Sequence, residues 1–188
     1  KQTEMKIAIT GNIGSGKSEV IKFLSLKGYK CISSDQIIKS LYQDNNSREY
    51  ILNRIGLSHK NYKEEIIKKL SDPIFNKNLK KVIYPMLYAK KKIIAPKFDN
   101  FIPTFYEVPL LFEENLAQDF DGTIFINTNI LIRKKRVLQR GVTDQYFHLM
   151  NQKQLKENIK KNLSDLTIDN NGSILNLRLN VIKLLRTL

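Results

Sequence analysis

The sequence holds one cysteine and lacks any long apolar segment. Cys31 stands alone among 188 residues, so no intramolecular disulfide can form, which suits a reducing compartment. No apolar run approaches the roughly 18 residues that a membrane-spanning helix needs, and the N-terminal residues show no signal-peptide pattern. We therefore expect a cytoplasmic protein that has no membrane partner.

Acidic residues are also scarce. The chain carries 18 Asp and Glu against 32 Lys and Arg, a formal net charge of +14. One interpretation is an anionic partner such as nucleic acid or a polyphosphate. A second is compositional drift, because 25 of the basic residues are Lys and 7 are Arg, the residue better suited to bidentate phosphate recognition. The sequence has no stripe of interleaved Arg and aromatic residues, so compositional drift is favoured over nucleic-acid binding as the origin of the charge. The positive charge would still attract a multi-phosphate substrate toward the protein.

Glycine is sparse, with 8 residues in the chain, yet three of them fall in the segment Gly11–Ser18. This segment reads GNIGSGKS and matches G-x-x-x-x-G-K-[ST] in full. A strand-like run, Lys6–Thr10, precedes it and a helical pattern, Glu19–Lys27, comes after it, which is the context that a phosphate-binding loop requires. In such a loop the glycines let the main chain approach the phosphates, and the backbone N–H groups converge at the positive end of a helix.

The loop predicts a nucleoside triphosphate together with Mg²⁺. Lys17 would reach the β- and γ-phosphates, and the Ser18 hydroxyl would ligate the metal ion. The main chain of the loop would surround the phosphates. The predicted nucleotide contacts in this segment are Gly11, Asn12, Ile13, Gly14, Ser15, Gly16, Lys17, Ser18 and Glu19.

Strand and helix patterns alternate along most of the chain. After the first strand, short strand candidates lie at 29–33, 104–108, 123–127 and 166–169. We therefore expect an α/β fold with a five-stranded, mainly parallel sheet that helices cover on both faces. No internal repeat or linker divides the chain, which predicts a single domain over residues 1–188.

A Lys-rich helical excursion interrupts the alternation over residues 48–98, where no strand candidate occurs. Residues 44–47 are expected to form a turn before it. A helix is predicted to start at Ser71-Asp72-Pro73. Pro85 is expected to divide the helical region beyond that start into two helices, and Pro96 to end the second of them. In the C-terminal part, helical patterns lie at 130–139, 144–163 and 174–185.

One carboxylate and two arginines lie where a kinase would need charged side chains. Asp35 comes just after the second predicted strand, and ligands bind at the carboxyl ends of parallel strands, so Asp35 could face the γ-phosphate. It could equally cap a helix over residues 36–42, and position alone does not decide between the two. On the basic helix, Arg136 and Arg140 could close over the transferred group, whereas Arg133 is expected to matter much less.

The sequence lacks the motifs that are typical of other classes of phosphate-loop protein. The sequence has no N-K-x-D element, with which a GTPase would recognise guanine. A motor or transport ATPase usually has an apolar strand that ends in Asp, but the strands predicted here end in Ser33, Val108 and Asn127. A small-molecule kinase needs only the loop, a base near the γ-phosphate and mobile arginines, so that interpretation is favoured.

Four segments between Thr10 and Ser173 match one known pattern in the same order. Thr10–Ser18 reads TGNIGSGKS, one residue away from T-G-G-I-G-S-G-K-S. The motif V-P-L-L-F-E is intact as Val108–Glu113, and I-D-N-N-G-S is intact as Ile168–Ser173. Arg136 and Arg140 match a lid pattern R-x-x-x-R. On these segments the chain resembles the dephospho-coenzyme A kinase family.

The resemblance implies a fold, a reaction and a set of roles. The core would be that of a nucleotide kinase, with a helical substrate-binding subdomain at 48–98 and a lid region at 129–152. A monomer would transfer a phosphoryl group from ATP to the ribose 3′-hydroxyl of dephospho-CoA, which yields CoA in the final step of its synthesis. Asp35 would be the base, and Lys17 and Arg140 the remaining catalytic residues. Arg136 in the lid region would also contact the nucleotide, as would Asn170 and Gly172 in the C-terminal segment after Ile168.

Three of the positions that depart from the family pattern bear on activity. Ser33 replaces the first Asp of D-A-D, and Tyr84 replaces the His of H-P-L. Glu19 replaces a Thr beside the phosphates, where a carboxylate needs either solvent or a cation. These changes keep an inactive kinase open as an interpretation. Two more interpretations stay open: another nucleotide or small-molecule kinase of the same fold, and a basic nucleic-acid-binding protein that keeps the loop.

Overall fold

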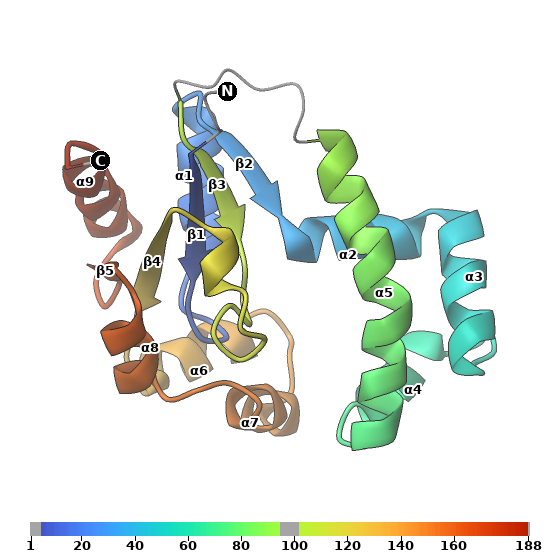
Figure 1. Cartoon of the computed structure of the whole chain (residues 1–188). Coiled ribbons are helices and arrows are strands. Elements are labelled where there is room, and N and C mark those ends of the chain that lie inside the picture. The colour runs from blue at the N-terminus through green and yellow to red at the C-terminus, as the bar shows by residue number, and fades with distance from the viewer. Residues whose placement is uncertain (1–4, 95–101, 188) are drawn as a thin grey trace. The chain divides into compact units, whose positions relative to one another are not determined.

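A parallel sheet of five strands forms the centre of the protein. A computed structural model describes residues 5–94 and 102–187, and within them every strand pairing is parallel. The order across the sheet is β2-β3-β1-β4-β5, which confirms the predicted fold class (Figure 1). The strands are β1 Lys6–Thr10, β2 Lys30–Ser33, β3 Thr104–Glu107, β4 Gly122–Asn127 and β5 Leu166–Asp169.

The chain divides into two compact units. The first, here called the sheet unit, comprises 5–33 and 102–187 of the described residues, and the second, the helical unit, comprises 34–94. The sheet unit carries α1 Lys17–Leu26, α6 Ile130–Leu138, α7 Asp144–Gln152, α8 Glu157–Leu163, α9 Ile174–Leu185 and the short 3₁₀ turn η2 Ala117–Asp119. The helical unit carries α2 Ser34–Gln43, α3 Asn45–Ile55, α4 Tyr62–Lys69 and α5 Pro73–Ile94.

The core of the sheet unit lies between the sheet and the two helices α1 and α9. Four of the five residues of β1 are buried, as expected for a central parallel strand that is covered on both faces. The core members are Ile7, Ile9, Val20, Ile21, Phe23, Leu24, Phe105, Ile124, Ile126, Ile168, Leu177 and Val181. This packing fixes the start of α1 directly beyond the end of β1, and so positions the loop between them.

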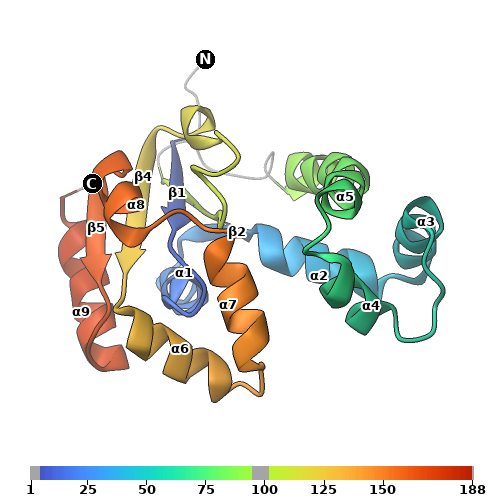
Figure 2. The same ribbon diagram turned by 90° about the horizontal axis from the view of Figure 1, so that it is seen from below.

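The helices α6 and α7 lie at the carboxyl ends of the strands (Figure 1), and α8 leads from there to the start of β5. Seen from below in Figure 2, α6 and α7 lie beside the end of α1 from which the phosphate loop leads back to β1. The predicted helix 144–163 is in fact two helices, because residues 153–156 leave the helical path to contact the loop. The sequence pattern alone could not show this break, since it depends on contacts with residues 12 and 13.

The helical unit is held together by apolar side chains. Leu41 on α2, Ile51 on α3, and Leu79 and Ile83 on α5 form its buried cluster. The unit begins at Ser34, earlier than the predicted excursion at residue 48. The predicted turn at 44–47 is wrong, because the Asp44 carboxylate accepts a hydrogen bond from Ser47 N and caps α3.

Two proline predictions have different outcomes. Pro73 opens α5 as predicted, at the first helical position, where proline loses no hydrogen bond. Pro85 does not divide the helix, since α5 runs unbroken for 22 residues. Packing of α5 against α2 and α3 offsets the one hydrogen bond that Pro85 removes. Pro96 lies outside the described residues.

Candidate active site

The phosphate loop is held in place by close contacts at two of its glycines. Gly14 has φ 79° and Gly16 has φ 99°, values that side chains other than glycine rarely adopt. A Cβ atom at Gly14 would lie 2.6 Å from the carbonyl oxygen of Arg133, and one at Gly16 would lie 2.3 Å from Asn170 Nδ2. The loop can therefore fit between α6 and the segment after β5 only with glycine at these positions.

Lys17 lies inside the curve of the loop. Its side chain is buried, and Nζ donates to the carbonyl oxygens of Gly11 at 2.8 Å and of Asn12 at 3.3 Å. Lys17 is also the first residue of α1, where backbone N–H groups point out of the helix end. The ammonium group and this helix end together make a positively charged concavity, the arrangement that a polyphosphate requires.

Residues from distant parts of the chain fasten the outside of the loop. Thr128 Oγ1 and Asn170 Nδ2 both donate to the carbonyl oxygen of Ser15, at 3.0 and 2.7 Å. Ile13 N donates to Gln154 Oε1 at 2.7 Å, which ties the loop tip to the connection between α7 and α8. The buried side chain of Asn170 therefore supports the loop, a role that the sequence did not predict for it.

The two predicted lid arginines occupy different surroundings. Arg136 Nη2 donates to the carbonyl oxygens of Asn170 at 3.1 Å and of Gly172 at 3.5 Å, so the structure brings these three predicted residues together. Burial, and to a smaller extent the charge of Arg140, lowers the pKa of the Arg136 guanidinium. Arg140 lies just beyond the end of α6 and is exposed. Arg140 is therefore accessible to a ligand, while Arg136 holds the turn after β5.

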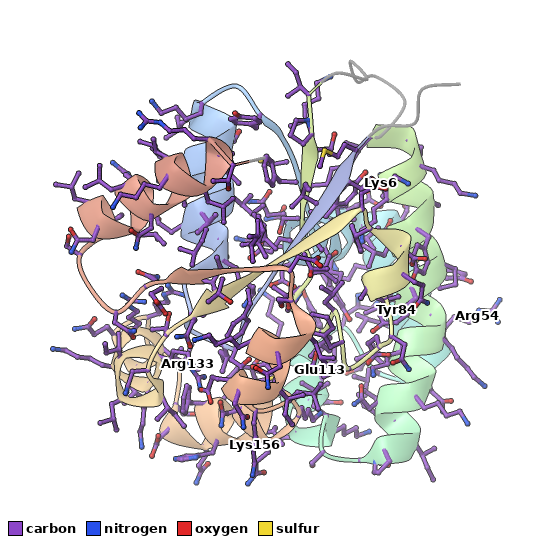
Figure 3. All side chains as sticks on the ribbon, turned by 60° about the vertical axis from the view of Figure 1, so that its left-hand side comes forward. Lys6, Arg54, Tyr84, Glu113, Arg133 and Lys156 are labelled. Carbon is purple, nitrogen blue, oxygen red and sulfur yellow. The ribbon has the colours of Figure 1, made fainter. Side chains whose placement is uncertain are left out.

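Arg133 is buried, although it belongs to a run of basic residues on α6. The Arg133 side chain, labelled in Figure 3, is 1% exposed. It forms an ion pair with Glu157 on α8. Arg133 Nη1 donates to the carbonyl oxygen of Ile13 at 3.1 Å and to Asn151 Oδ1 at 3.0 Å, and Nε donates to the carbonyl oxygen of Thr128. One buried guanidinium thus connects the phosphate loop, α6, α7 and α8. The expectation that Arg133 matters much less for turnover than Arg140 stays a prediction.

The V-P-L-L-F-E segment contributes a second buried ion pair. Glu113 Oε1 lies 2.7 Å from Lys160 Nζ and accepts a hydrogen bond of 2.9 Å from Leu155 N. Lys160 is fully buried and also donates to the carbonyl oxygen of Pro109. Burial lowers the pKa of Lys160, while the hydrogen bond from Lys160 to Glu113 opposes that effect. The motif therefore anchors α8 and the connection that contacts the loop.

The chain is similar to known proteins over nearly its whole length. A family model described as dephospho-CoA kinase matches residues 5–176. The chain belongs to the dephospho-CoA kinase family. A dephospho-CoA kinase from Rickettsia prowazekii is 31% identical over 191 residues, which cover 98% of this chain and 97% of the relative.

Solved structures show the same fold. A crystal structure from Thermus thermophilus superposes with a TM-score of 0.85 at 25% identity, over 98% of this chain and 97% of the other. The dephospho-CoA kinase from Campylobacter jejuni superposes with a TM-score of 0.62 at 22% identity, over 98% and 97% of the two chains. The family membership makes this protein a kinase with a small-molecule substrate and a nucleotide-binding loop.

The departures from the dephospho-CoA kinase pattern have local explanations. Glu19 lies 3.6 Å from Arg178 on α9, so the carboxylate beside the loop meets a cation. That guanidinium also stacks over the ring of Phe23, 5.5 Å from its centroid. In the helical unit, Tyr84 packs edge-on against Tyr88. The two tyrosines thus pair on one face of α5.

Ser33 contacts Glu107, a residue for which the sequence patterns indicated no role. It donates a hydrogen bond to Glu107 Oε2, and Ser18 Oγ donates to Glu107 Oε1 at 2.7 Å. Glu107 is 1% exposed and is the last residue of β3, which ends one residue earlier than predicted. The predicted end of this strand at Val108 was therefore wrong by one residue, and the strand ends in a buried carboxylate.

Asp35 lies in the first turn of α2, as the second residue of that helix. The N-cap interpretation for Asp35 is therefore wrong, because the helix already begins at Ser34. A carboxylate in the first turn still favours the helix through its dipole. Asp35 belongs to the helical unit, and its role as a base stays a prediction.

Proposed function

We propose that the protein phosphorylates the ribose 3′-hydroxyl of dephospho-CoA with ATP and so produces CoA. The proposal rests on one observation: the family match over residues 5–176 coincides with a complete phosphate loop that closes around a buried Lys17. The loop amides, Lys17 and Arg140 would neutralise charge that spreads over the γ-phosphoryl oxygens in the transition state. Release of Lys17 Nζ from the two loop carbonyls would be needed for it to reach the phosphates.

The nucleotide is proposed to bind along the loop, from Gly11 to Glu19, with Arg136, Asn170 and Gly172 beside it. The contacts of Arg136 with the main chain of residues 170 and 172 support this grouping. Arg136 Nη1 is buried and has no hydrogen-bond partner among the described residues, so it is available to an acceptor on the nucleotide. Glu19 would remain paired with Arg178 and away from the phosphates.

The residues beside Ser18 also fit a magnesium ion. No group of three or more His, Cys, Asp or Glu residues within the described chain could hold a metal by itself. Mg²⁺ does not need one, because it usually keeps several waters and binds substrate phosphates with one or two protein groups. The Ser18 hydroxyl and the buried carboxylate of Glu107 supply such a pair of oxygens. Bound there, Mg²⁺ would neutralise charge on the β- and γ-phosphates.

Asp35 is proposed as the base that accepts the proton of the ribose hydroxyl. Residues 48–98, within and just beyond the helical unit, are proposed to hold dephospho-CoA, and residues 129–152 to act as the lid that excludes water. Within the described residues no helix is long and apolar enough to span a bilayer. We further propose that the protein works as a cytoplasmic monomer, which size-exclusion chromatography and cell fractionation would check.

An assay of ADP release tests the reaction. The purified protein with ATP and Mg²⁺ should release ADP rapidly with dephospho-CoA as acceptor, and only slowly with water, adenosine or AMP. Phosphorus NMR of the product should show a new 3′-phosphomonoester. Faster release with another acceptor would replace dephospho-CoA as the substrate, and no release with any acceptor would favour an inactive kinase.

A further inference from the structure

The tip of the phosphate loop is bonded to the side chain of Gln154. Ile13 N donates to Gln154 Oε1 at 2.7 Å, and the two residues lie 141 positions apart in the sequence. Gln154 is half-buried and belongs to the connection between α7 and α8, outside both the loop motif and the region that we propose as the lid. A neutral amide oxygen thus accepts from a loop N–H, the kind of group that binds phosphate oxygens in such a loop.

The peptide group between Asn12 and Ile13 indicates which phosphate is concerned. Its carbonyl oxygen accepts from Lys17 Nζ at 3.3 Å, and its N–H donates to Gln154. In a phosphate loop the lysine reaches the β- and γ-phosphates, so the cation that would contact them shares one peptide group with Gln154. Gln154 is therefore placed at the end of the loop where the terminal phosphate of ATP would bind.

The main chain next to Gln154 is held on both sides. Leu155 N donates to Glu113 Oε1 at 2.9 Å, and the carbonyl oxygen of Leu155 accepts from Asn12 Nδ2 at 3.0 Å. The side chain of Gln154, in contrast, makes one hydrogen bond among the described residues, that with Ile13. The side chain can therefore turn about its own bonds while its backbone stays fixed beside the loop.

A glutamine amide has the chemistry that this position needs. It carries an acceptor and two donors on one neutral group. Oε1 satisfies Ile13 N, while Nε2 has no hydrogen-bond partner in the part of the chain that the structure describes. A glutamate would bring a negative charge toward the phosphates and repel them, and a lysine would have no acceptor for Ile13 N.

We propose that Gln154 binds the terminal phosphate of ATP. Its amide turns away from Ile13, so that Ile13 N and Gln154 Nε2 both donate to oxygens of the γ-phosphate. The inference rests on the proposed function, because it takes the loop to bind ATP. Since ADP lacks the γ-phosphate, this contact favours the phosphoryl donor over the product, and specificity is such a difference of affinities.

The test compares ATP with ADP by binding alone, so it does not depend on turnover. Isothermal titration measures the affinities of ADP and of the β,γ-imido analogue of ATP, each with Mg²⁺. Gln154→Met keeps the length of the side chain without its hydrogen-bonding groups. It should bind the ATP analogue about tenfold more weakly, as expected for one lost hydrogen bond to a charged group, and ADP as wild type does. Gln118→Met, an exposed position in η2, is the matched control and should bind both nucleotides as wild type does.

A second variant separates phosphate binding from mere support of the loop. Gln154→Glu keeps an acceptor for Ile13 N but replaces the donor with a negative charge, so it should lose about tenfold or more in affinity for the ATP analogue relative to ADP. If Gln154 only supports the loop, Gln154→Glu will bind both nucleotides as wild type does, and Gln154→Met will weaken both equally; either result would overturn the inference. If Gln154→Met does not fold, Gln154→Glu decides alone. Failure of the wild type to bind either nucleotide would overturn the proposed function as well.

Discussion

The sheet unit and the helical unit bury different kinds of side chain. Among the described residues, every buried polar or charged side chain except Ser34 belongs to the sheet unit. Most of these groups lie around the phosphate loop, where Lys17, Arg133 and Glu107 are each less than a tenth exposed. The buried cluster of the helical unit is apolar, formed by Leu41, Ile51, Leu79 and Ile83.

This difference indicates that the two units have different roles. Buried polar groups cost free energy unless they are fully hydrogen-bonded, but once in place they need no reorganisation when charge develops nearby. The sheet unit therefore holds the main chain of its loop ready for a polyphosphate, whereas Lys17 Nζ would have to leave the carbonyl oxygens of Gly11 and Asn12. Apolar contacts tolerate changes of shape better than a polar network does, which suits the substrate-binding role that we propose for the helical unit.

The largest effect should come from Lys17→Ala in the sheet unit. Because Lys17 supplies the buried positive charge at the loop, its removal should lower kcat by roughly 10³–10⁵-fold, the range for a cation acting on the transferred phosphoryl group. Steady-state ADP release gives kcat, and circular dichroism checks that the variant is folded. Lys22→Ala, on the exposed face of α1, is the control and should keep normal kcat. Near-normal turnover of Lys17→Ala would contradict the proposed role of the loop.

The next effect concerns Asp35, the one catalytic group that we place in the helical unit. Asp35→Asn keeps the size of the side chain but cannot accept a proton. It should lower kcat by roughly 10²–10⁴-fold, the usual contribution of a positioned acid or base, while nucleotide affinity stays near normal. Kinetics at saturating ATP, together with a fluorescent-nucleotide titration, separate the two effects. If kcat is unchanged, the helical unit supplies no base and its role is restricted to binding.

Arg133 and Arg140 provide a matched pair at the same helix. Arg133→Ala should lower the free energy of unfolding by about 3 kcal/mol, because it removes the buried partner of Glu157 and the donor to three other groups. Arg140→Ala, at an exposed position, should leave stability within about 0.5 kcal/mol of wild type but lower kcat roughly 10²-fold. Urea denaturation and steady-state kinetics on both variants check this. Equal behaviour of the two variants would remove the distinction between a supporting and a catalytic arginine.

The smallest effect is expected from the apolar cluster. Leu79→Ala should cost about 2 kcal/mol of stability, at the low end for a buried leucine, and raise the KM for dephospho-CoA without changing nucleotide affinity. Ile74→Ala, exposed on the same helix, should change neither. Thermal denaturation and titration with a nucleotide analogue give both quantities. Weaker nucleotide binding in Leu79→Ala would show that the two units do not act separately.

Much of the fold could be predicted from local patterns in the sequence. The five strands were predicted within one residue at each end, because buried parallel strands are short apolar runs with clear boundaries. The break expected at Pro85 does not occur, because the packing of a 22-residue helix outweighs the low helix propensity of one residue. The break at residues 153–156 was missed because its cause is a set of contacts with the phosphate loop.

The candidate site was predictable only where its residues form a motif. Arg133 belongs to a run of four basic residues, and nothing in that run distinguishes the buried arginine from its exposed neighbours. Glu107 could not be assigned a role from the sequence, because a shift of one residue in the end of β3 changes which side chain lies beside Ser18. The pairing of Glu107 with Ser33 depends on the order of β2 and β3 in the sheet, which no local pattern encodes.

The sequence by itself determined the phosphate loop, because β1, the glycine segment and α1 are contiguous and their geometry is local. The positions of Lys17 and Ser18 are set by that geometry alone. The tertiary structure decided which side chains surround them: Glu107 reaches Ser18 across 89 residues, and Asn170 reaches Ser15 across 155. The physical reason is that the parallel sheet brings the carboxyl ends of its strands to one edge, in an order different from their order in the chain.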